Sequence, residues 1–218
     1  MFKRIIIATH ASLICLCLLA FSDDLVAQEK GLIARLSSSD GDQNQAGGEF
    51  VVVESVNDLD DLVVKYRDER IHVALAAVGS FSTWSTINDV DIRKLRDDVE
   101  QYVRHSIVER ELFLQLGAES PGSSRANVYL SWTSKHVSEM PWNGKNPSQQ
   151  VGWGMTSLNV LMVEKGWSTP TRIATIKDVK LKTALESAKS FAKESSAGVW
   201  RIKKAMDAIE EFDRKENH

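Results

Sequence analysis

The chain has 218 residues, and its 27 lysines and arginines against 30 aspartates and glutamates give a formal net charge of −3 at pH 7. The length and near-average composition fit one domain with short appendages, and no internal repeat or heptad pattern is present. The mild negative charge argues against a general polyanion-binding protein, which attracts its ligands with a positive field.

The first 27 residues, Met1–Ala27, read as a secretory signal peptide. Lys3 and Arg4 precede an apolar run over residues 5–21, and we expect cleavage after Ala27 or at a nearby site. An uncleaved anchor helix has the same pattern, although the run is about as short as a spanning helix can be. A cleaved signal predicts a secreted or periplasmic protein with no transmembrane segment after the signal is removed.

Both cysteines of the chain, Cys15 and Cys17, fall within this apolar run. The mature protein therefore contains no cysteine. Disulfides, thiolate catalysis and cysteine-ligated zinc are not expected. The chain also lacks the P-loop, GxSxG and HExxH patterns.

The next segments predict a linker and three strands. Residues 28–48 are rich in Ser, Gly, Gln and Asp and should form a flexible linker. The runs Phe50–Val56, Leu62–Tyr66 and Ile71–Val78 are β-branched or apolar and are separated by an acidic and a charged turn. This arrangement predicts a β-meander.

The hydrophobic period changes after residue 88. Apolar residues recur every three or four positions over Asp91–Leu114, which predicts an amphipathic helix with Asp89 or Asp91 at its N-cap. Strands followed by a helix that packs on them indicate a small barrel of the α+β class.

The C-terminal half predicts short elements around a long polar excursion. A strand is expected at Arg125–Trp132, and the excursion Ser134–Gly154 contains Trp142 and Trp153. Residues 201–218 read as a charged helical tail on the surface. Between these segments we expect a short helix or turn at Asn159–Lys165, a brief strand at Ile173–Thr175 and a helix at Lys180–Lys193.

Three stretches, taken in order, resemble the staphylococcal nuclease family. The pattern N-x-x-M-V-x-x-G over Asn159–Gly166 precedes ALESAKSFAKESSAGVW at Ala184–Trp200, and Val56–Val78 matches the first three strands of the family without a gap. The resemblance covers residues 50–200 and implies an OB-fold-type five-stranded β-barrel flanked by about three helices. It also implies the chemistry of that family, the calcium-dependent hydrolysis of phosphodiester bonds.

Carried over position by position, the resemblance retains only part of the family's site. Asp60 falls on the first calcium-binding aspartate, Asp58 on the acidic residue before it, and Arg125 on the second phosphate-binding arginine. Since Ca²⁺ prefers six to eight oxygen ligands, we expect impaired catalysis and calcium only at a residual site. Three functional residues of the family are missing. Ala74 replaces the first phosphate-binding arginine, Gly79 replaces the second metal-binding aspartate, and Ser82 replaces the general-base glutamate.

Two further pairs of residues are candidates for binding. Arg70 and His72 share a strand face with Ala74 and can contact an anion there. The alternative is that they bind no ligand and are simply a solvated turn arginine and a half-exposed histidine. Trp142 and Trp153 can stack on a base or a sugar or anchor a protein, or they can close a small satellite core. The predicted partner is therefore a single-stranded nucleic acid, a glycan or a protein.

An active calcium-dependent endonuclease with a rearranged site is the alternative prediction. Asp58, Asp60 and Asp61 form the strongest candidate cation cluster in the sequence, and Arg125 can join them. The three aspartates can also be explained as a polar hairpin turn that binds no cation.

Overall fold

The computed structural model describes residues 48–59, 61–79, 81–117, 125–132, 156–171 and 173–216. The strands in these ranges are β1 Gly48–Asp58, β2 Asp61–Tyr66, β3 Glu69–Leu75, β4 Glu111–Leu116, β5 Ala126–Trp132 and β6 Thr156–Ser157. The α-helices are α2 Phe81–Ser85, α3 Val90–Ile107, α5 Leu158–Glu164, α6 Val179–Glu194 and α7 Lys203–Glu216. Two 3-10 helices, η2 Ile173–Thr175 and η3 Gly198–Arg201, complete the described elements.

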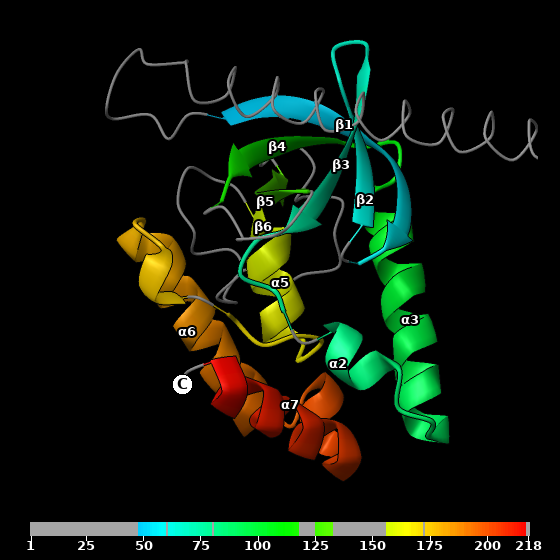
Figure 1. Ribbon diagram of the computed structural model, residues 1–218, viewed down its shortest axis with the longest axis vertical. Helices are drawn as coiled ribbons and strands as arrows, with labels where there is room; N and C mark the ends of the chain where they lie inside the picture. The colour runs from blue at the N-terminus through cyan, green and yellow to red at the C-terminus, as the bar shows by residue number, and fades with distance from the viewer. Residues whose placement is uncertain are drawn as a thin grey trace, which may run out of the picture.

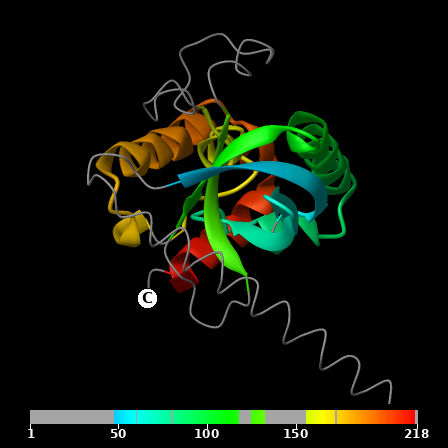
Figure 2. The ribbon, with the colours of Figure 1, turned by 90° about the horizontal axis from the view of Figure 1, so that it is seen from above.

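Five of the strands close into a barrel. The sheet order is β3-β2-β1-β4-β5-β6, and β3 also pairs in parallel with β5, with Val73 opposite Ala126 and Leu75 opposite Val128. Strands β1, β2 and β3 form the predicted antiparallel meander. The protein is therefore of the α+β class, with the barrel at the top of Figure 1 and seen from above in Figure 2.

The core lies inside the barrel and continues into the helices below it. Val64, Val73 and Val128 are fully buried, while their strand neighbours are partly or fully exposed, as a barrel with one dry and one wet face requires. All seven residues of α5 are buried, because this helix packs between β5 and α6 (Figure 1).

The helix predicted over Asp91–Leu114 is wrong at its C-terminal end. Asp89 caps α3, accepting a hydrogen bond of 3.0 Å from the Asp91 backbone N–H. However, α3 ends at Ile107, and the residues from Glu111 onward form β4, between β1 and β5. The chain reverses at Glu109, whose φ is 62°.

The structure differs from three further expectations, two in the C-terminal part of the chain and one in the number of helices. The strand expected at Ile173–Thr175 is the 3-10 helix η2. The tail is helical as expected and forms α7, but it packs against α2 and η3 and fully buries Ala205 and Ile209. The described residues contain five α-helices, whereas the resemblance implies about three.

Several predictions fall on residues outside the described ranges. These are the signal peptide, almost all of the linker, Asp60, and the excursion that carries Trp142 and Trp153.

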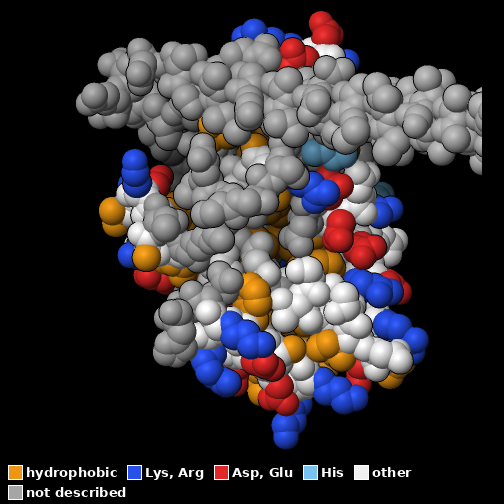
Figure 3. Space-filling model, viewed as in Figure 1, with side chains coloured by type: hydrophobic (Ala, Val, Ile, Leu, Met, Phe, Trp, Pro, Cys, Tyr) orange, Lys and Arg blue, Asp and Glu red, His pale blue; other side chains and the backbone are white. Residues whose placement is uncertain are grey.

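Over the described ranges, no helix combines the length and apolar character needed to cross a membrane. On the face shown in Figure 3, basic and acidic side chains are interleaved over the helices.

Candidate functional site

Four polar side chains meet on the outer wall of the barrel around Asp61. The Oδ1 atom of Asp61 lies 2.8 Å from Nδ1 of His72, and its Oδ2 atom lies 3.3 Å from Nη2 of Arg125. Asn57 Nδ2 donates a further hydrogen bond of 3.3 Å to Oδ2. We call these four residues, Asn57, Asp61, His72 and Arg125, the Asp61 cluster.

The strand register brings these residues together from distant parts of the chain. Asp61 begins β2, and in the β2–β3 ladder Leu62 lies opposite Val73, the residue after His72. The parallel pairing of Val73 with Ala126 then places Arg125, the residue before β5, beside His72. Closure of the barrel therefore creates the contact between Asp61 and Arg125, which are 64 positions apart in sequence.

Asp61 is the charged centre of the cluster. Partial burial by itself raises the pKa of Asp61, but the hydrogen bonds from His72 and Asn57 and the positive charge of Arg125 outweigh this effect. The pKa of Asp61 therefore lies below its ordinary value of 3.8. At neutral pH Asp61 is a carboxylate that holds the side chains of His72 and Arg125 side by side.

The hydrogen bond to Asp61 also sets the orientation of His72. A carboxylate only accepts hydrogen bonds, so the proton on this side of the ring is on Nδ1. The other ring nitrogen, Nε2, remains available for a ligand, since the His72 side chain is about one-third exposed (32%) and lines a groove.

This groove runs over the outer faces of β1, β2 and β3. Its volume is about 820 Å³, and Asn57, Val63, Arg70 and His72 line it. The structure thus places Arg70 and His72 on the same wall, as the strand period indicates. Arg70 Nε pairs with Glu54 Oε2 at 2.6 Å, and His72 contacts Asp61, so both expected anion contacts already have a carboxylate partner.

The acidic turn between β1 and β2 is only partly described. Asp58 is exposed, and its Oδ1 atom accepts a hydrogen bond of 2.6 Å from the Leu59 backbone N–H, as in a polar hairpin turn. Asp60 lies outside the described ranges. Among the residues that the structure describes, no three histidine, cysteine, aspartate or glutamate side chains are grouped so that they could hold a metal ion.

The structure also shows the surroundings of Ala74, Gly79 and Ser82, the three positions at which the resemblance predicts lost site residues. Ala74 pairs with Asn127 and is half-buried, and Ser82 is exposed on α2. Gly79 is packed so tightly that an added Cβ would lie 2.5 Å from Cγ2 of Thr171. An aspartate at position 79 would therefore require Thr171 to move.

Sequence reasoning did not identify Asn57 as a site residue or pair Asp61 with His72. The two-residue strand period placed His72 on the correct face, but the contact depends on the register between β2 and β3. A search for outward-facing polar residues on adjacent predicted strands could have found the pair.

Neither a scan against protein-family models nor a search of the curated proteins returned a match to this chain.

Proposed function

We propose that this protein is a binding module with an OB-type barrel, related to staphylococcal nucleases, that holds a phosphate of single-stranded nucleic acid at the Asp61 cluster. The observation that carries the proposal is the convergence of His72 and Arg125 on Asp61, at 2.8 and 3.3 Å. The Asp61 carboxylate brings His72 and Arg125 side by side on the outer wall of the barrel. A phosphate can accept hydrogen bonds from Arg125, and from Nε2 of His72 in its imidazolium form, since in the neutral form the ring's one proton is on Nδ1.

The position of the cluster in the barrel supports this proposal. The strands follow an antiparallel meander, then the helix α3, and then β4 and β5, with β5 returning parallel to β3. OB-fold barrels bind oligonucleotides on strands 2 and 3 and on the loops between strands 1 and 2 and between strands 4 and 5. Asn57, Asp61, His72 and Arg125 lie at these places.

We propose further that calcium-dependent hydrolysis is impaired. Ala74 offers no hydrogen-bond donor to a phosphate, and Ser82 cannot accept a proton at neutral pH without a base of its own. Both carboxylate oxygens of Asp61 already accept hydrogen bonds within the cluster, which lowers their value as calcium ligands.

Export from the cytoplasm is the other part of the proposal, and it rests on the composition of Met1–Ala27. N-terminal sequencing of the protein recovered from its producing cells should find a residue at or close to Gln28 first. Recovery of the intact chain from the cytoplasm would contradict it.

A cleavage and retention assay tests the proposed function. The protein from Gln28 onward is incubated with single-stranded DNA and RNA in calcium or in chelator, and both cleavage and bound nucleic acid are measured. We expect retention without cleavage in either solution. Calcium-dependent cleavage that disappears in Asp60→Ala would instead support the second candidate, the rearranged endonuclease, two of whose predicted residues, Asp61 and Arg125, lie in contact.

The absence of both retention and cleavage would overturn the nucleic-acid proposal. A glycan or a protein would then be the ligand to test, with Trp142 and Trp153 as the residues to substitute.

A further inference from the structure

We propose that the ligand is a chain longer than a dinucleotide, which continues from the Asp61 cluster into a second hollow, where another of its phosphates contacts Arg104. This inference rests on the proposed function, because it extends the same ligand. It assigns a role to a surface that the resemblance to nucleases does not involve.

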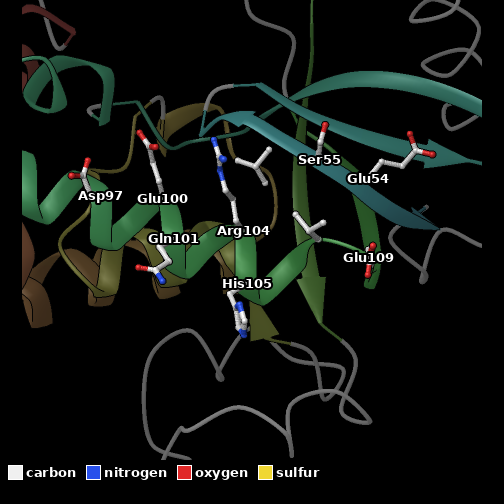
Figure 4. Close-up of a pocket in the computed structure, with 10 residues that line it drawn as sticks. Glu54, Ser55, Asp97, Glu100, Gln101, Arg104, His105 and Glu109 are labelled. Atoms are coloured by element: carbon white, nitrogen blue, oxygen red, sulfur yellow. The ribbon is translucent and has the colours of Figure 1, made fainter.

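The second hollow lies between β1 and the C-terminal half of α3, as Figure 4 shows. Its volume is about 890 Å³, and it shares Glu54, Ser55 and Glu109 with the groove that contains His72. The two depressions therefore adjoin along β1. An extended ligand that contacts His72 can follow a path along the outer face of β1 toward α3.

Arg104 is the cation that this path reaches. In Figure 4 it extends from α3 toward β1, whereas His105 points to the opposite side of the helix. Two other arginines near the path are already paired, Arg70 with Glu54 at 2.6 Å and Arg96 with Asp97 at 3.0 Å. Within the described part of the chain, Arg104 has no such carboxylate partner, and its side chain is exposed to a ligand.

The carboxylates of the second hollow define the kind of chain that fits. Four carboxylates line it together with Gln101 and Arg104, namely Glu54, Asp97, Glu100 and Glu109. These carboxylates repel a plain polyanion, but they can accept hydrogen bonds from the amino groups of unpaired bases. The mixture favours a single strand, whose phosphates and base edges are both accessible, over a duplex or an inorganic polyphosphate.

Fluorescence anisotropy with a labelled single-stranded DNA of about eight nucleotides tests this inference, with an unlabelled dinucleotide as a competitor. We expect the longer strand to bind at least about tenfold more tightly than the dinucleotide, because a second charge-assisted contact contributes about this factor. Arg104→Ala should remove about tenfold of the affinity for the longer strand. It should leave the affinity for the dinucleotide unchanged.

The salt dependence gives a second readout that does not depend on the absolute affinity. Loss of one phosphate contact should reduce the slope of log affinity against log salt by roughly 0.7 for a single strand. The matched control is Arg93→Ala, an exposed arginine of α3 that lines neither depression. This control should change neither the affinity nor the slope, and thermal melts of both variants establish that they are folded.

The outcomes separate this inference from the function on which it rests. If the affinity for the dinucleotide falls in His72→Ala and Arg125→Ala while strand length and Arg104→Ala have no effect, only the extended path is wrong. If neither ligand responds to His72→Ala and Arg125→Ala, the proposed function itself is wrong. Equal binding of a duplex or of inorganic polyphosphate would overturn the assigned role of the second hollow.

Discussion

Asn159 donates a hydrogen bond of 2.7 Å to the carbonyl oxygen of Ala76, which lies 83 residues earlier in the chain. The same amide group donates to the carbonyl of Val128 at 3.0 Å and accepts from the N–H of Leu130 at 3.0 Å. Asn159 is fully buried in α5, so it connects this helix to the end of β3 and to β5. These two strands close the barrel and set Arg125 beside His72.

Replacing Asn159 should weaken the barrel at its closure. In Asn159→Ala the three hydrogen bonds are lost and buried backbone groups are left without them, so the free energy of unfolding should fall by about 2–4 kcal/mol. Urea denaturation measures the change. Asn88→Ala, at an exposed position, is the control and should stay within about 0.5 kcal/mol of the parent. Equal stability of the two variants would show that Asn159 does not stabilise the closure.

Gly166 should tolerate no side chain. Its φ is 66°, a left-handed conformation, and an added Cβ would lie 2.2 Å from the carbonyl oxygen of Ala197. Gly166→Ala should therefore lower the free energy of unfolding by at least about 2 kcal/mol. Ser190→Ala, on the exposed side of α6, serves as the control. A Gly166→Ala variant as stable as this control would mean that the turn after α5 is formed differently.

The helix α7 should contribute to global stability. Ile209 is fully buried, so Ile209→Ala removes packed methyl groups and should cost about 2–4 kcal/mol. Thermal unfolding should show one transition at a lower temperature. Glu210→Ala, exposed on the same helix, should change it little. If both variants melt like the parent, α7 would be the independent surface tail that its charged sequence suggests.

The fold could be predicted from sequence where turns mark the ends of strands. The meander of β1, β2 and β3 follows the expected runs, because acidic and charged turns separate them. The boundary between α3 and β4 was missed for a physical reason. Leu112 and Leu114 alternate as a strand requires, but Leu112 also follows Val108 by four residues and Leu114 follows Ile107 by seven, which are spacings that a helix repeats. Glu109 occupies the left-handed turn without the glycine that would mark it.

The site could be predicted only as separate residues. The period of a strand placed Arg70 and His72 on one face, and the resemblance selected Arg125. Their relation to Asp61 depends on two strand pairings, β2 with β3 and β3 with β5, and the second joins residues far apart in sequence. The period along one strand indicates the face on which a residue lies, but it does not indicate which residue of the neighbouring strand lies opposite it.

The stability contributed by Asp61 should depend on pH in a definite direction. Because its pKa is lower in the folded protein than its ordinary value of 3.8, the carboxylate stabilises fully above that value and loses its effect as the pH falls through the folded pKa. The difference in melting temperature between the parent and Asp61→Asn should be largest near neutral pH and shrink below about pH 4. A difference that stays constant down to about pH 2 would contradict the ionised centre of the cluster.

The measurement that tests the account most directly is the affinity for a short single-stranded DNA in His72→Ala and Arg125→Ala, compared with the parent and with Arg93→Ala. Each substitution in the Asp61 cluster should weaken binding about tenfold, because each removes a charge-assisted donor to the phosphate. Arg93→Ala should bind like the parent. Unchanged affinity in both cluster variants, with their folds intact, would show that the Asp61 cluster is not where the ligand binds.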